Sequence, residues 1–87
     1  MIALNDRVRS TLDLQPTSLL VDSLLVLEAL GITTDAERQT RAWLCDYLEE
    51  RHPVLTASLV AWAAGDSPLS YCQTIAAVLR REGIIQP

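Results

Sequence analysis

Three side chains near the middle of the chain have the spacing of a candidate metal or catalytic site. Cys45, Glu49 and His52 stand at positions i, i+4 and i+7, so a helix over this region would place them on one face. A transition metal accepts a thiolate, a carboxylate and an imidazole, but zinc takes four ligands, and no second cluster in the sequence supplies the fourth. We favour the alternative interpretation, a buried cysteine, a solvated glutamate and a histidine that ends a helix.

A serine in an apolar segment offers a second kind of chemistry. The segment DSLLVLEALGI, residues 22–32, resembles the part of acyl carrier proteins in which the serine of a DSL motif at a helix start carries phosphopantetheine. The resemblance implies that Ser23 is the attachment point and that Asp22 is its acidic neighbour. In this chain, however, the Asp-Ser pair lies inside the apolar stretch, which favours a core helix that tolerates two polar residues.

Two adjacent arginines, Arg80 and Arg81, are candidates for contacts with DNA phosphates. Residues 71–84 resemble the first helix of the helix-turn-helix in recombinase and plasmid regulator families, with an Ile-Ala pair, a leucine three residues after the alanine, and then Gly83-Ile84. The resemblance implies a DNA-binding regulator that uses the C-terminal helix, residues 68–84. The recognition helix would begin where the sequence ends, and without it the arginines contact phosphates but cannot specify bases.

The motifs of common enzymes are missing from the sequence. It has one histidine, and neither the nucleophile-elbow motif GxSxG nor the zinc-protease motif HExxH occurs. Its three glycines all fall in predicted links, so none is left to form a phosphate-binding loop. We therefore expect no enzyme, no cofactor and no bound metal.

The elements that must position these side chains are predicted to be helices arranged around one apolar segment. In residues 18–30, SLLVDSLLVLEAL, the only polar residues are Ser18, Asp22, Ser23 and Glu28. At about 100° per residue these four point in different directions, so no continuous solvent face remains. The sequence therefore predicts a central buried helix here, with the other helices wrapped around it.

Four further helices are predicted from apolar spacing and from start and stop residues. Thr34 and Glu37 have the spacing of a capping box, and Ser67-Pro68 is a typical helix start. The segments Gly31-Ile32 and Gly83-Ile84 are typical of helix ends. The further helices are expected at residues 5–12, 35–51, 54–64 and 68–82.

The chain has more apolar residues than one small core can enclose. Of its 87 residues 49% are hydrophobic, and two predicted helices, residues 18–30 and 54–64, are almost wholly apolar. A chain of this size buries only roughly 60–65% of its unfolded surface. Surplus apolar surface usually marks an interface, and a homodimer is the commonest way to cover it.

Aromatic and arginine side chains are the candidate interface residues, because both types are favoured at protein contacts. Trp43 and Tyr47 share one face of the predicted third helix, which also carries Arg38 and Arg41. Trp62 lies in the second apolar segment. The alternative for the three aromatic residues is the core of the monomer.

Charge and composition narrow the class of partner and the location. The net charge is −4 and the seven arginines are scattered, which argues against nonspecific binding of nucleic acid. No apolar run reaches the roughly 20 residues that a membrane span needs, and the start has no apolar region typical of a signal peptide. Two distant cysteines indicate reduced thiols, so we expect a cytoplasmic protein.

The sequence thus predicts a single all-α domain over residues 1–87, a compact bundle of about five short helices. Its expected function is non-enzymatic: protein–protein interaction, beginning with self-association into a homodimer, as in accessory, adaptor or antitoxin-like proteins. A DNA-binding regulator is the alternative, and an acyl-carrier-like protein is the second alternative.

Overall fold

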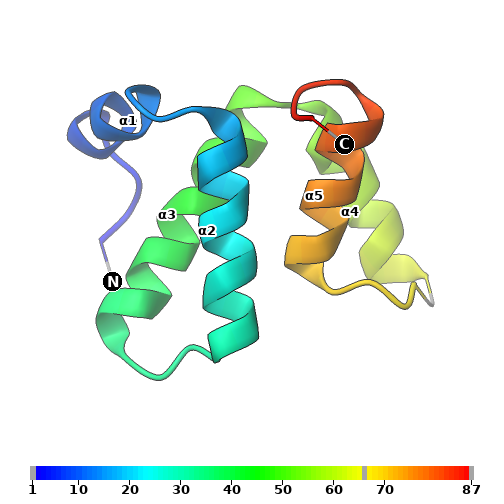
Figure 1. Ribbon diagram of the computed structural model, residues 1–87, viewed down its shortest axis with the longest axis horizontal. Helices are drawn as coiled ribbons and strands as arrows, with labels where there is room; N and C mark the ends of the chain where they lie inside the picture. The colour runs from blue at the N-terminus through cyan, green and yellow to red at the C-terminus, as the bar shows by residue number, and fades with distance from the viewer. Residues whose placement is uncertain (1, 66, 87) are drawn as a thin grey trace.

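The computed structural model describes residues 2–65 and 67–86, and the regular structure in these residues is helical (Figure 1). The five helices are α1 (Asp6–Asp13), α2 (Thr17–Leu30), α3 (Asp35–Arg51), α4 (Val54–Ala64) and α5 (Tyr71–Arg81). The predicted all-α fold of about five short helices is therefore confirmed.

Helix α3 begins at the start signal that the sequence predicts. The Thr34 hydroxyl oxygen accepts a hydrogen bond from the Glu37 amide at 3.1 Å. The Glu37 carboxylate in turn accepts one from the Thr34 hydroxyl at 2.8 Å and one from the Thr33 hydroxyl at 3.3 Å, where a full capping box would use the Thr34 amide. The cap is thus formed, with hydroxyl donors in place of the backbone donor.

Helix α5 begins later than the sequence predicts, because a stronger cap lies downstream. Ser67 and Pro68 belong to the loop before the helix. The Ser70 hydroxyl oxygen accepts a hydrogen bond from the Gln73 amide at 3.1 Å, and the Ser70 amide donates to the Gln73 side chain at 3.0 Å. This capping box satisfies two backbone amides at once, so it fixes the start of α5 at Tyr71 and corrects the predicted start at residue 68.

Glycine ends α5 as predicted, with one difference in the residue that packs back on the helix. Gly83 has a φ of 74°, which favours glycine, and the Ile84 amide donates to the Leu79 carbonyl at 2.9 Å. The buried apolar residue is Ile85 and not Ile84, which stays 36% exposed. The closing contact therefore falls one residue later than the pattern indicates.

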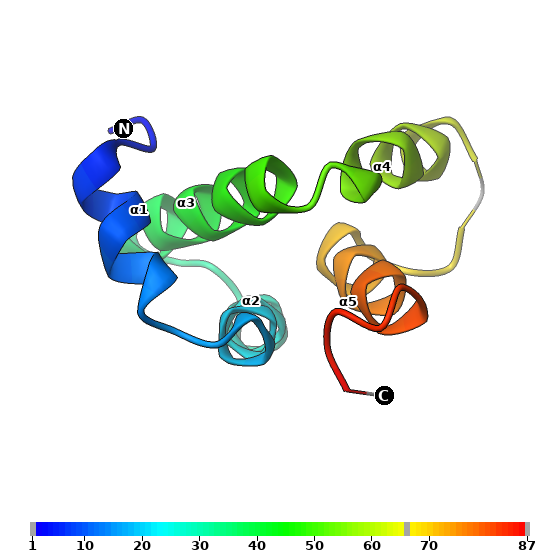
Figure 2. The same ribbon diagram turned by 90° about the horizontal axis from the view of Figure 1, so that it is seen from above.

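The helices form two groups when the molecule is seen from above (Figure 2). One group holds α1, α2 and α3, and the other holds α4 and α5. Helix α3 leads into α4 through the short His52-Pro53 link. Helix α5 joins the two groups, because it packs on α4 and also on α2.

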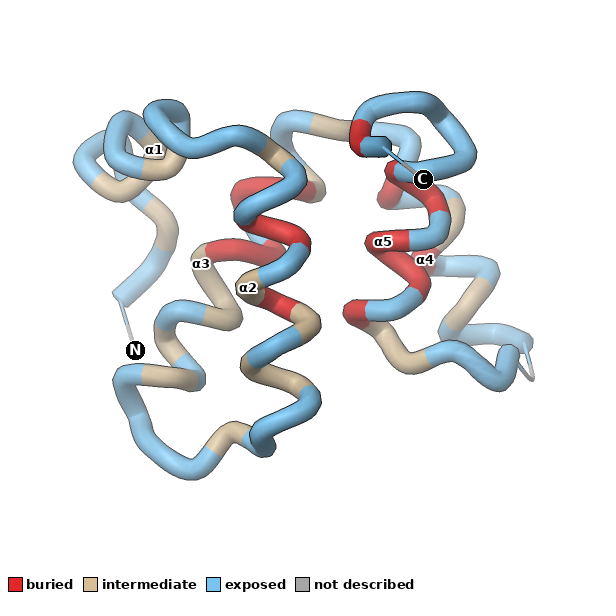
Figure 3. Tube along the Cα trace, in the orientation of Figure 1, coloured by how far each residue is buried: buried red, intermediate tan, exposed pale blue. Residues whose placement is uncertain are grey.

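The core lies where α2, α3, α4 and α5 meet, and α5 contributes most to it (Figure 3). Six of the eleven residues of α5 are buried, against four from α3, three from α2 and two from α4. The largest fully buried side chains of the core are Leu24, Leu48, Leu55, Ile75 and Leu79. Helix α1 has no buried residue and covers α3 from outside.

Helix α2 is buried on one side only, which corrects the expectation that it is enclosed all round. It contacts α3 and α5 through Leu20, Val21 and Leu24, all of which are buried. Leu19 and Leu30, by contrast, remain exposed. The absence of a polar face in the sequence thus marks a helix with two apolar sides, of which the monomer covers one.

Candidate functional site

The outer side of α2 carries a straight apolar stripe. Leu19 is 47% exposed, Val26 55% and Leu30 78%. At about 100° per residue these three side chains lie within about 40° of one another around the helix axis, and roughly opposite the buried Leu24. Ser23 falls on the same line, so the stripe runs 19, 23, 26, 30 with spacings of four, three and four.

The one polar side chain in the stripe has its hydrogen bond inside the helix. The Ser23 hydroxyl donates to the Leu19 carbonyl at 2.9 Å. Covering the stripe with a partner therefore leaves this donor satisfied and avoids the cost of a buried, unpaired polar group. We call the four residues Leu19, Ser23, Val26 and Leu30 the α2 stripe.

A groove between α2 and α5 borders the stripe. Its apolar lining comes from Leu25 and Ala29 of α2, Leu69 of the preceding loop, and Ala76 and Ala77 of α5. The polar lining residues are Glu28, Gln73 and Arg80. Apolar surface thus continues from α2 toward α5, and the charged residues Glu28 and Arg80 also line the groove.

Two of the sequence-predicted interface residues hold the N-terminal segment and α1 against α3. The Trp43 indole donates to the Ile2 carbonyl at 2.8 Å. Tyr47 is buried, and its hydroxyl donates to the Asp13 carboxylate, which also pairs with Arg51 at 3.0 Å. In this structure both aromatic residues contact their own chain.

The other three predicted interface residues are divided between solvent and an aromatic cluster. Arg38 is exposed and pairs with Asp35 at 3.2 Å. The Arg41 guanidinium lies 5.5 Å from the centre of the Tyr71 ring, and Trp62 meets the same ring edge-on with centroids 5.6 Å apart. Tyr71 is therefore the centre of a cluster that joins α3, α4 and α5, and the sequence analysis did not single it out.

Cys45, Glu49 and His52 do not form a metal site in the structure. Among residues 2–65 and 67–86, no group of three or more potential metal ligands comes together. The Glu49 carboxylate accepts a hydrogen bond from the Tyr71 hydroxyl at 2.9 Å. Burial raises the pKa of the Cys45 thiol to about 12, so the reactive thiolate is scarce at neutral pH. Glu49 is thus half-buried and hydrogen-bonded, where the alternative interpretation expected a solvated side chain.

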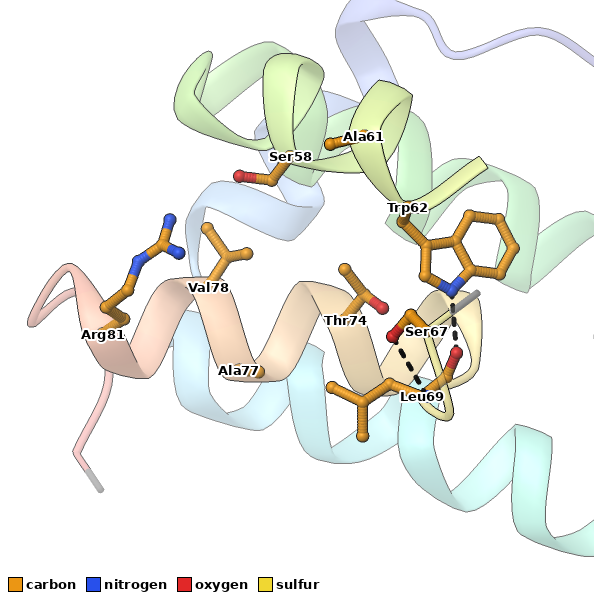
Figure 4. A pocket seen from close by; sticks show the side chains of 9 residues that line it. All are labelled: Ser58, Ala61, Trp62, Ser67, Leu69, Thr74, Ala77, Val78 and Arg81. Carbon is orange, nitrogen blue, oxygen red and sulfur yellow. Dashed lines mark hydrogen bonds between the residues drawn. The ribbon is translucent and has the colours of Figure 1, made fainter. Parts of the chain in front are cut away.

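The residues of the two alternative functions lie on different helices. Ser23, the carrier candidate, sits in the middle of α2 and not at its start. Arg80 and Arg81 are exposed in the last turn of α5. Arg81 stands at one end of a hollow between α4 and α5, and Trp62 stands at the other end and donates to the Leu69 carbonyl at 2.7 Å (Figure 4).

Comparison of the chain with protein-family models, with curated proteins and with solved structures finds no match. In the described part of the chain, no helix has the length and apolar character needed to cross a bilayer.

Proposed function

We propose that this protein is a non-enzymatic helical module that acts by protein–protein interaction, and that the α2 stripe is its contact surface. The observation that carries the proposal is the exposure of Leu19, Val26 and Leu30 in one line. Leaving such side chains in water is unfavourable by about 25 cal/mol per Å² of apolar surface, so a complementary surface gains that free energy on contact.

A second exposed apolar face supports an interaction role. Helix α4 contains no charged residue, and Val60 on its outer side is 66% exposed. Apart from Val54, its other exposed residues are small: Thr56, Ala57, Ala61, Ala63 and Ala64. This face offers less apolar area for each residue than the α2 stripe, so we assign the principal contact to α2.

Self-association is the first interaction to test, because a second copy of the chain is always present. Light scattering after size exclusion should give a mass that rises with concentration for the native protein. Val26→Asp places a charge in the stripe and should keep the protein monomeric. Ser10→Asp adds the same charge to an exposed position of α1, outside the stripe, and is the matched control. Native protein that stays monomeric, or a dimer unaffected by Val26→Asp, contradicts the proposal.

A mobility-shift experiment on the purified protein distinguishes this function from DNA binding. The chain carries a net charge of −4, and contacts with phosphates would have to come from Arg80 and Arg81. We expect no mobility shift with duplex DNA in about 0.15 M salt, the ionic strength at which distant charges are screened. A salt-dependent shift that is lost in Arg80→Ala/Arg81→Ala would favour the regulator instead.

A further inference from the structure

We propose that two copies of the chain pair antiparallel along the α2 stripe, about a two-fold axis that passes between Ser23 and Val26. The inference rests on the proposed function and adds the identity of the partner, the direction of pairing and the register.

The stripe is symmetric about its own midpoint. Its residues stand at 19, 23, 26 and 30, so reversing the helix places Leu19 against Leu30 and Ser23 against Val26. A two-fold interface needs this property, because each contact must occur twice with the roles exchanged. The spacing of four, three and four is also that of the contact line between two paired helices.

The antiparallel arrangement also keeps the Asp22 carboxylates of the two copies from facing each other. Asp22 is the exposed acid beside the stripe. With the axis midway between residues 24 and 25, Asp22 lies level with Leu27 of the second copy, and the two Asp22 residues are offset by about 7.5 Å along the axis at 1.5 Å per residue. The carboxylates therefore do not meet across the interface.

The ends of α2 favour an antiparallel neighbour. No side chain caps its first turn by a hydrogen bond, no acid lies in that turn, and no base lies in the last turn. The partial positive charge at the start and the partial negative charge at the end are thus uncompensated by the helix's own side chains. An antiparallel copy brings opposite ends together, whereas a parallel copy brings like ends together.

Neighbouring apolar groups extend the contact beyond the stripe. Leu14, in the link before α2, is 81% exposed, and Leu69, beside the groove between α2 and α5, is 40% exposed. A standard stable interface buries about 800 Å² on each partner, more than the stripe alone offers. With so small an apolar area in the stripe itself, we expect a dimer that dissociates on dilution.

Crosslinking of two cysteine variants tests direction and register together. In the proposed pairing, residue 19 of one copy lies level with residue 30 of the other, while two copies of residue 19 are about 16 Å apart along the axis. Leu19→Cys and Leu30→Cys are therefore treated with a short bis-maleimide, each alone and as an equimolar mixture. The native Cys45 and Cys72 are buried and give little background.

The mixture should give a crosslinked dimer at a yield at least tenfold above that of either variant alone. A mixture of Leu19→Cys with Thr56→Cys, on exposed α4, measures the yield from random collision. Equal crosslinking of each variant alone means parallel pairing and overturns the inference. A native dimer without crosslinks above collision places the contact elsewhere, which overturns the inference but keeps self-association. A monomeric native protein overturns both.

Discussion

At the scale of single residues, a few polar side chains tie helices that are distant in sequence to one another. Tyr47 and Arg51 both engage Asp13, and the Arg51 guanidinium also lies 5.3 Å from the centre of the Tyr47 ring. Glu28 accepts a hydrogen bond from the Ser70 hydroxyl at 2.6 Å, which ties the start of α5 to α2. These polar contacts hold α1 on α3 and α5 on α2, and none of them involves a residue of the α2 stripe.

Removing the Tyr47 hydroxyl tests whether its bond to Asp13 stabilises the attachment of α1. Tyr47→Phe keeps the ring and deletes one donor, so it should lower the free energy of unfolding by about 1 kcal/mol. Urea titration measures the change. Arg38→Ala breaks an exposed ion pair and should cost only a few tenths of a kcal/mol. A Tyr47→Phe protein as stable as the native one would show that this bond contributes nothing.

The single histidine gives a pH test of the link between α3 and α4. Burial lowers the pKa of His52 from its ordinary value of 6.5. The folded state therefore resists protonation, and stability that is full above about pH 6.5 is lost as the pH falls toward the folded pKa. Urea titrations at pH 7.5 and 5.5 should show a loss that is smaller in His52→Gln. Equal losses in the two proteins would contradict the burial of this imidazole.

At the scale of elements, the helix count, the end of α3 and the break at His52-Pro53 could be read from the sequence. Proline and glycine act locally, so their effect does not depend on the remainder of the fold. The start of α5 could not be settled so simply, because Ser67-Pro68 and the Ser70–Gln73 pair are competing caps. The Ser70–Gln73 cap satisfies two backbone amides, and the Ser70 hydroxyl also donates to Glu28 of α2, so this cap joins the helix start to the fold.

The side of α2 that faces the core could not be predicted from the sequence. With apolar residues all round, the sequence gives no sign of which side faces the core, and full burial was the natural expectation. The spacing 19, 23, 26, 30 was present in the sequence but hidden among the neighbouring leucines. Contact with α3 and α5 selects one side, and the stripe is what remains outside.

An aspartate should therefore destabilise the fold strongly on the buried side of α2 and only slightly on the exposed side. Leu24 is 1% exposed, and Leu24→Asp buries an unpaired charge that costs several kcal/mol out of the roughly 5–15 kcal/mol expected of a domain. Val26→Asp stays in water and should remain within about 1 kcal/mol of the native protein. Circular dichroism melts at low concentration compare the two. Two variants that melt alike would contradict the assigned orientation of α2.

At the scale of the whole molecule, the chain encloses one core and leaves apolar surface on two separate helices. Helices α2 and α4 lie on different sides of the molecule, so a single contact cannot cover both (Figure 2). The α2 stripe has longer side chains, a symmetric spacing and a satisfied serine hydroxyl. These features favour α2 for self-association and leave α4 available for a further surface.

Sedimentation equilibrium of the native protein and of Val26→Asp, each at low and at high salt, tests the central claim most directly. An apolar contact does not depend on screened charges, so the native protein should form a dimer in both salts. Val26→Asp should dissociate the dimer at least tenfold more readily, which corresponds to about 1.4 kcal/mol. A native protein that is monomeric at high micromolar concentration, or a dimer that Val26→Asp leaves unchanged, would contradict the account.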